Sequence, residues 1–351
     1  MPESLRKYAP ALFFIGGFAW DAVTLGHSIK PIDLFLLAGY LGGAAVILVI
    51  LGRRSSGPSE FLGVPRPTSS VEPRHAEEPR NWYGYLSPLL QFFFGGIFSA
   101  LFIFYFLSSG GLGGYLFVLG LAALLIGNEF LGSRYSELTL SWTFFTLSAC
   151  MFFNFALAHL FRSISVFWFY LGTLAAVLLV VVLRRVSRQG SASVVPSLLV
   201  AGVLLLLHLF NLIPPVPLVK KQMLIAHGVR REGRNYVARI ESPGWRIWRA
   251  SSPTFHRSGG EPVYCFTSVF VPNGIRTTIR HRWEHEGRTI DVRPFPIIGG
   301  RQGGYRGYTL KQNLIPGRWR VTAESESGAA IGFVDFVVVE GEPHEMKKVR
   351  L

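Results

Sequence analysis

The chain has 351 residues, of which 50% are hydrophobic and only 16% are charged. Soluble domains carry about a quarter charged residues, and the apolar residues here form long runs before Pro214, so the composition excludes one large soluble domain and indicates membrane helices. The net charge of +14 arises mainly in residues 214–351, which hold 22 Lys and Arg against 12 Asp and Glu. This basic part should attract anionic partners.

Seven apolar segments approach the ~20 residues that a helix needs to cross ~30 Å of hydrocarbon. The first is the shortest and contains Asp21. No small-residue cleavage site follows it, so we expect a retained helix rather than a signal peptide. Together the segments predict an all-α transmembrane domain over residues 1–213, with helices at Ala9–Leu25, Leu34–Leu51, Leu86–Leu107, Leu112–Leu131, Leu138–Leu160, Ile164–Leu183 and Val194–Ile213.

Lysine and arginine residues set the predicted orientation. With the N-terminus inside, the inner segments hold 11 of them, whereas the short outer loops hold only Lys30 and Arg162. This bias predicts a multi-pass membrane protein with its C-terminal domain on the outer side. Lys220 and Lys221, just past the last helix, argue locally against it. Residues 53–85, rich in Pro, Ser and Glu, then form a flexible cytoplasmic linker.

The chain changes character after the last apolar segment. Prolines at 214, 215 and 217 end the helix and favour an extended join over residues 214–221. Over residues 222–351 the apolar residues recur with period two between turn signals, which predicts an all-β, immunoglobulin-like antiparallel sandwich. The expected strands are Met223–Val229, Tyr236–Ile240, Val263–Val271, Thr277–His285, Thr289–Pro296, Tyr305–Gln312, Arg318–Ser325 and Ile331–Val339.

Several motifs together resemble one bacterial membrane-protein family. They are Asn128-Glu129-Phe130-Leu131, residues 211–218, His281-Arg282-Trp283, residues 299–309 and Trp319-Arg320-Val321. Over residues 128–339 the chain is similar to the family called domain of unknown function 2914, most specifically toward its C-terminal end. The resemblance implies a multi-helix bacterial membrane protein with a C-terminal β domain. Together with the charge bias it predicts a protein of the bacterial inner membrane whose C-terminal domain lies in the periplasm. No activity is known for that family, so it implies no catalytic residue.

Residues 299–309, with the sequence GGRQGGYRGYT, are the strongest candidate for a binding site. Backbone N–H groups in a glycine-rich loop, together with guanidinium groups, can surround a phosphate, sulfate or carboxylate. The alternative is a tight hairpin whose glycines serve bulges and positive φ angles and whose arginines are solvated. The Lys-Ser/Thr ending of a P-loop is missing. The predicted anion site consists of Arg301, Gly303, Gly304, Tyr305, Arg306 and Tyr308.

Residues 281–285, with the sequence HRWEH, formally match the H-x-x-E-H motif of zinc peptidases. That chemistry needs a helix, but the flanking residues are typical of a strand and a turn. On a strand, His281 and His285 would lie about 13 Å apart, with Glu284 on the other face. We therefore expect no metal and no cofactor, with Trp283 packed inside the sandwich.

Six polar residues lie toward the predicted outer ends of the helices. Ionisable groups at membrane depth often mark proton or substrate paths, and Asp21 with His208 would be the pair carrying such chemistry. The alternative is that these side chains lie in the interface and hydrogen-bond to neighbouring helices. The six are Asp21, His27, Asn154, His159, His208 and Asn211.

These patterns favour a non-enzymatic binding module. The outer domain is expected to bind an anionic envelope component, such as a lipid head group or a glycan, or a partner protein through residues 301–308; its outer location excludes nucleic acid. The alternative is a transporter or membrane enzyme that uses the polar residues at the outer helix ends, with the β domain as a cap. A structural or assembly role is a third hypothesis. Cys150 and Cys265 lie in such different environments that we predict no disulfide.

Overall fold

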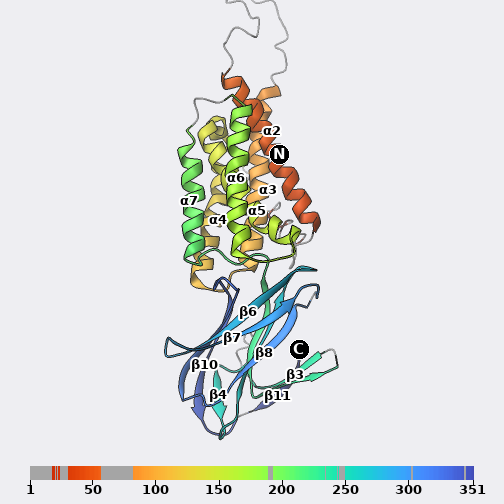
Figure 1. Ribbon diagram of the computed structural model, residues 1–351, viewed down its shortest axis with the longest axis vertical. Helices are drawn as coiled ribbons and strands as arrows, with labels where there is room; N and C mark the ends of the chain where they lie inside the picture. The colour runs from red at the N-terminus through yellow and green to blue at the C-terminus, as the bar shows by residue number, and fades with distance from the viewer. Residues whose placement is uncertain are drawn as a thin grey trace, which may run out of the picture.

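A helical bundle and a β domain are stacked along the long axis of the molecule (Figure 1). The computed structural model describes residues 31–56, 82–188, 193–233, 235–242, 250–301, 303–343 and 345–351, and also residues 18, 19, 21, 23 and 244. Most of the predicted helix Ala9–Leu25 and most of the predicted linker at 53–85 lie outside these residues, as does His27.

The described residues form six α-helices, not the seven predicted from the sequence. Five are long and apolar enough to cross a membrane, whereas α7 has only 15 residues. It stops short of the predicted Ile213 because Asn211 adopts a φ of +54°, a conformation that commonly ends helices. The helices are α2 (Pro31–Ser56), α3 (Leu86–Leu107), α4 (Leu112–Phe130), α5 (Leu138–Leu160), α6 (Val166–Val186) and α7 (Val195–Leu209), with short 3₁₀ helices η1 (Trp82–Tyr85) and η2 (Gly132–Ser136).

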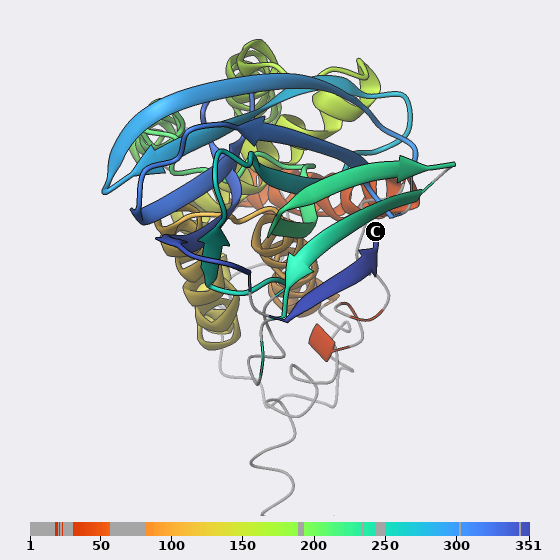
Figure 2. The same ribbon diagram turned by 90° about the horizontal axis from the view of Figure 1, so that it is seen from below.

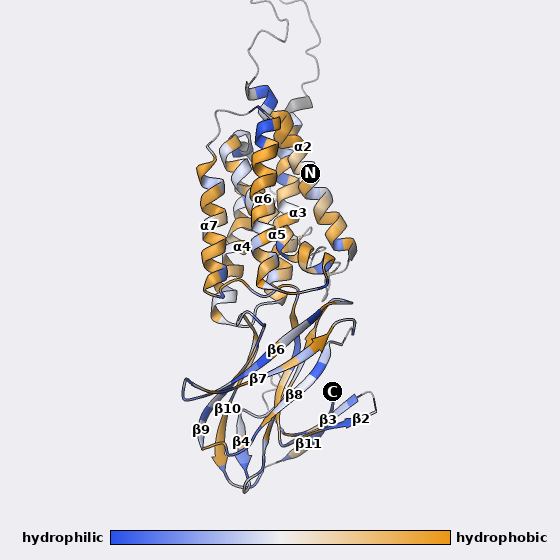
Figure 3. Ribbon diagram, viewed as in Figure 1, coloured by the Kyte–Doolittle hydropathy of each residue, from blue (hydrophilic) through white to orange (hydrophobic). Residues whose placement is uncertain are grey.

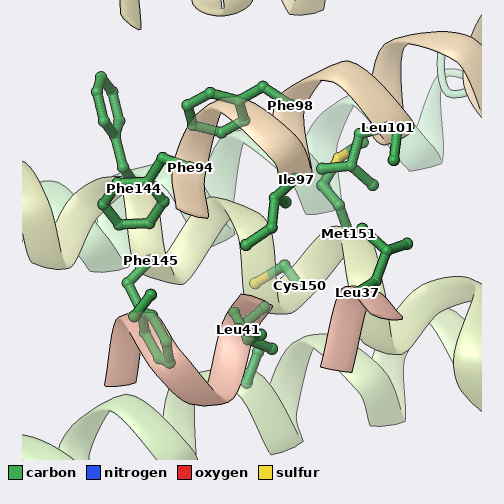
Figure 4. Close-up of a cluster of buried hydrophobic side chains, with 14 of the residues drawn as sticks. Leu37, Leu41, Phe94, Ile97, Phe98, Leu101, Phe144, Phe145, Cys150 and Met151 are labelled. Atoms are coloured by element: carbon green, nitrogen blue, oxygen red, sulfur yellow. The ribbon is translucent and has the colours of Figure 1, made fainter. Parts of the chain in front are cut away.

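Helix α5 is the centre of the bundle, because it contacts α2, α3, α6 and α7. Aromatic and aliphatic side chains from α2, α3 and α5 fill the space between the helices (Figure 4). The rings of Phe98 and Phe144 meet edge to face, with their centroids 5.5 Å apart. The helices are hydrophobic over most of their length (Figure 3). Many of their large apolar side chains are exposed, which suits a bundle in contact with lipid.

The described residues of the β domain form eleven strands in three sheets. A five-stranded sheet has the order β4-β10-β9-β6-β7, and three-stranded sheets have the orders β1-β5-β8 and β11-β3-β2. Neighbouring strands are antiparallel except β4 and β10. The strands are β1 (Val219–Ala226), β2 (Gly228–Glu232), β3 (Asn235–Glu241), β4 (Thr254–Arg257), β5 (Val263–Phe270), β6 (Arg276–His285), β7 (Arg288–Ile298), β8 (Tyr305–Lys311), β9 (Gly317–Glu324), β10 (Ala330–Glu340) and β11 (Met346–Arg350).

These sheets form three layers rather than the two of a simple sandwich. The β1-β5-β8 sheet is the middle layer, and β5 is buried on both faces. Cys265 of β5 belongs to the same buried cluster as Trp283 and Trp319 of the five-stranded sheet, whereas its neighbour Phe266 belongs to a second cluster with Ala238 of β3. Figure 2 shows β2, β3 and β11 near the C-terminus, on the side opposite β6 and β7.

The join between bundle and β domain is compact. Val216 donates a backbone hydrogen bond to Pro214 and Leu218 donates one to Pro215, both at 2.9 Å, so these residues form turns instead of the predicted extended spacer. Val216 belongs to the buried core of the bundle and Leu218 to that of the β domain. Gly110, between α3 and α4, lies so close to β10 that an added Cβ would be 1.9 Å from the backbone of Ile331. The two parts are therefore closely packed.

Candidate functional site

The loop between β7 and β8 is held in place through its backbone. Gly299 donates a hydrogen bond to the carbonyl of Ile275 at 2.8 Å, and a Cβ at this position would lie 1.8 Å from the carbonyl oxygen of Pro272. Gly304 has a φ of +84°, and Ser268 Oγ donates to the Gly303 carbonyl at 2.7 Å. The tight-turn interpretation of these glycines is therefore consistent with the geometry, and the loop displays its arginines from a fixed backbone.

A hollow of about 550 Å³ lies between this loop and the β2–β3 hairpin. We call it the arginine pocket; its lining residues are Arg231, Tyr236, Arg301, Gly303, Gly304, Tyr305 and Arg306. Three guanidinium groups thus share one concave surface, and the lining residues that the structure describes include no Asp or Glu. Because arginine stays protonated at all physiological pH values, the pocket has a permanent positive charge.

Local contacts orient these arginines. Arg231 Nε donates to the carbonyl of Gly233 at 3.2 Å, and Arg306 Nη1 donates to Asn235 Oδ1, also at 3.2 Å. The guanidinium carbon of Arg301 lies 5.9 Å from the centroid of the Tyr305 ring. Contacts of this kind reduce the freedom that each side chain loses when it binds a ligand. The pocket suits an anionic group whose oxygens accept paired N–H donors, such as phosphate, sulfate or carboxylate.

Five of the six predicted loop residues line the pocket, and Tyr308 does not. The ring of Tyr308 instead packs near Tyr236 and Tyr264, with centroids 6.2 Å and 5.8 Å away. The sequence reasoning missed Arg231 and Tyr236, which join the site from a hairpin about 70 residues earlier in the chain. The basic run Arg230-Arg231 was the available signal, but nothing in it indicates which strand it faces.

The motif at residues 281–285 lies on strand β6, as the sequence predicted, rather than on a helix. His281 is fully buried, with Nε2 2.7 Å from Thr267 Oγ1 and Nδ1 2.8 Å from Thr309 Oγ1. Burial lowers the pKa of His281 to about 3. Trp283 is also fully buried and donates from Nε1 to Thr309 Oγ1 at 3.3 Å. Both residues thus belong to the interior of the β domain.

A second polar cluster was not anticipated from the sequence. Glu241, buried at the end of β3, has Oε1 2.8 Å from His227 Nε2 and Oε2 2.7 Å from His256 Nδ1. Glu261 Oε1 is 3.0 Å from the other ring nitrogen of His227, and the backbone N–H of His256 donates to Glu241 Oε1 at 2.7 Å. Within the described part of the chain, no group of three or more His, Cys, Asp or Glu residues could hold a metal ion. This cluster ties β3 to β4.

The polar residues predicted at the outer helix ends have separate partners. Ser99 of α3 donates to Asp21 at 2.6 Å, whereas His208 of α7 stacks on Phe169, with ring centroids 3.9 Å apart. The Asn211 side chain lies beside Gly328 of the β domain, and His159 lies in the last turn of α5. The structure therefore gives Asp21 and His208 different environments rather than joining them as a pair.

His208 does line a small cavity where the bundle meets the β domain. This junction cavity has a volume of about 170 Å³, and Asn154, Pro214, Ser325 and Glu326 also contribute to its wall. Asn154 donates from Nδ2 to the hydroxyl of Tyr105 at 2.9 Å. The cavity combines residues of α5, α7, the join and the β9–β10 turn.

The fold defines the class of the protein, which has several long apolar helices followed by a C-terminal β domain. Residues 276–338, from β6 into β10, match the family described as a protein of unknown function, DUF2914. The match confirms the resemblance expected from the sequence for this C-terminal region. It contains the β7–β8 loop but not the hairpin that supplies Arg231 and Tyr236. No curated protein matches the chain.

Proposed function

We propose that this protein is a multi-pass protein of the bacterial inner membrane whose basic, periplasmic β domain binds an anionic envelope component or an acidic partner protein. The domain acts as a non-enzymatic binding module. As in an immunoglobulin domain, loops at one end of a β scaffold carry the site. The ligand presents a phosphate, sulfate or carboxylate group to the arginine pocket.

One observation carries this proposal. Arg231, Arg301 and Arg306 come from two hairpins far apart in the sequence and line the same hollow, and none of the described residues in its lining carries a carboxylate. Three arginines around one hollow repel each other, and an anion that enters between them relieves that repulsion.

The distribution of basic residues supports the periplasmic orientation. Arg53, Arg54, Arg184 and Arg185 lie in the last turns of α2 and α6, at the end of the bundle far from the β domain (Figure 3). Arginine gathers on the cytoplasmic side of membrane proteins. A reporter enzyme that works only after export, fused after Leu351, should be active. Activity of a cytoplasm-specific reporter at the same position would reverse the orientation.

Binding is tested on the full-length protein in a neutral detergent by calorimetric titration with inorganic phosphate and sulfate. The wild type should bind at least one of them, and the double variant Arg301→Ala with Arg306→Ala should lose binding. Arg288→Ala is the matched control, because Arg288 is exposed at the opposite end of β7. Equal binding by the double variant and the wild type would remove the arginine pocket from the proposal.

The junction cavity favours a second candidate function, a transporter or membrane enzyme. His208 and Asn154 face it from the bundle and Glu326 from the β domain, so a solute there would touch both parts. This candidate predicts that His208→Ala abolishes uptake or turnover of a substrate while phosphate binding at the arginine pocket is unchanged. A His208→Ala strain that keeps every phenotype of the wild type would eliminate it.

A further inference from the structure

The arginine pocket lies at the end of the β domain that faces the helical bundle. Arg276, the first residue of β6, bridges to Ser163 in the turn between α5 and α6, and on its other side it pairs with Ile298, the last residue of β7. Neighbouring strands lie about 4.8 Å apart, so Ile298 is roughly 10 Å from Ser163. The loop that carries Arg301 starts at the next residue.

The pairing of β8 gives the same position independently. Tyr305 is opposite Val269 of β5, and the next residue of β5, Phe270, is opposite Val219 at the start of β1. Val219 directly follows the join, which begins after α7. Both ends of the β7–β8 loop therefore lie at the end of the β domain that contacts the α5–α6 turn and the join. In Figure 1 this is the end next to the bundle.

Aromatic residues mark the membrane boundary at this end of the bundle. Phe161, after α5, stacks on Trp168 of α6 with ring centroids 4.2 Å apart, and Trp is enriched where the hydrocarbon meets the head groups. The head-group layer adds roughly 5–7 Å on each side of the hydrocarbon. A loop about 10 Å from Ser163 is thus only a few ångströms beyond this layer, and the long side chain of Arg301 can extend from the loop toward the lipid phosphates.

The surface beside the loop is suited to this layer. Ile298 is 52% exposed although it sits next to the charged loop, and Tyr305 has a ring that can lie among head groups while Arg301 stays near it. Ile298 precedes the loop and does not line the pocket, but an exposed apolar side chain near two tyrosines and three arginines suits a lipid, with glycerol carbons beside a phosphodiester.

Building on the proposed function, we propose that the ligand of the arginine pocket is the phosphate of an anionic phospholipid in the outer leaflet of the membrane that holds this chain. Arg301 and Arg306 bind the phosphate oxygens, and Arg231 adds the charge that selects anionic over zwitterionic lipids. Ile298 contacts the glycerol carbons of the lipid. The β domain is thereby attached to the bilayer at a second point, away from the join.

Native mass spectrometry of the full-length protein in neutral detergent tests this, with phosphatidylglycerol, phosphatidylcholine and soluble glycerol 3-phosphate titrated separately. Phosphatidylglycerol should bind best. Each arginine lost from the pocket should weaken it about tenfold, so the Arg301→Ala, Arg306→Ala double variant should bind roughly a hundredfold more weakly. Arg288→Ala, with the same loss of charge about 33 Å away along β7, should bind like the wild type.

A second variant separates a lipid from a free phosphate. Ile298→Ser should weaken phosphatidylglycerol about fivefold and leave glycerol 3-phosphate unchanged. If glycerol 3-phosphate binds as tightly as phosphatidylglycerol and both depend on the arginines, the lipid assignment is wrong and the anion pocket stands. If both bind regardless of the arginines, or neither binds to the wild type, the lipid assignment and the proposed function fail together.

Discussion

The bundle and the β domain satisfy their buried polar groups in different ways. In the helices, Thr146 Oγ1 donates to the carbonyl of Trp142 and Thr173 Oγ1 to that of Phe169, each four residues earlier. In the β domain, His281 relies on Thr267 and Thr309, which belong to other strands. A threonine in a helix can satisfy its hydroxyl group within its own segment, whereas His281 depends on strands that only the complete β domain brings together. Polar substitutions should therefore be more damaging in the β domain.

The largest expected effect is in the core between the sheets. Trp283→Ala removes a fully buried ring from the β domain and should lower its free energy of unfolding by about 3–5 kcal/mol. Limited proteolysis during heating should show cleavage in residues 219–351 at a lower temperature. The helices should remain protected, and simultaneous loss of both parts would show that they unfold as one unit.

The buried cluster around Glu241 gives a second test of the difference between the two parts. Glu241→Gln keeps the shape but removes the charge that faces His227 and His256, and should destabilise the β domain by about 3 kcal/mol. Denaturant unfolding of the full-length protein measures the effect. In the bundle, Thr146→Val removes only a local hydrogen bond and should change the free energy of unfolding less. A loss as large as that of Glu241→Gln would contradict the difference between the bundle and the β domain.

Acid should weaken the β domain through His281. In the unfolded chain a histidine takes up a proton near pH 6.5, but in the folded domain the pKa of His281 is lowered to about 3 by burial. Between these values the unfolded state binds more protons, so stability falls as the pH decreases. At pH 5 the loss should be about 2 kcal/mol relative to pH 7. His281→Asn should flatten this part of the pH profile.

The smallest effect is expected at an exposed ion pair. Arg320 contacts Asp335 through Nε at 2.6 Å and Nη2 at 3.0 Å on the outer surface of the five-stranded sheet. Exposed pairs contribute about 0.2–1 kcal/mol, so Arg320→Ala should barely change the unfolding midpoint. A shift comparable to that of Glu241→Gln would mean that burial is not what separates the two sites.

Helix bounds were largely predictable because lipid demands continuous apolar runs. The predicted segments Leu86–Leu107 and Leu138–Leu160 coincide with α3 and α5. Strands with clear alternation, such as β6 and β9, were also found. The short strand β4 and the lysine-rich β11 were missed, because each is stabilised by its neighbouring strand rather than by its own pattern.

The layers of the β domain were not predicted. Residues 263–271 form a nearly continuous apolar run, which is typical of a strand buried on both faces and was available as a signal for a third sheet. Because the third sheet was not predicted, the sequence identified the arginines of the β7–β8 loop but not Arg231. Its position beside them depends on how the β11-β3-β2 sheet packs on the middle sheet.

The compact join has a mechanical consequence. Only Pro217 separates Val216, held in the bundle, from Leu218, held in the β domain. Rotating the β domain relative to the bundle about this point would expose Val216 or Leu218 to water. Exposing each side chain would cost about 1.5–3 kcal/mol. The protein therefore has no hinge here, and a force applied to the β domain passes directly into α7.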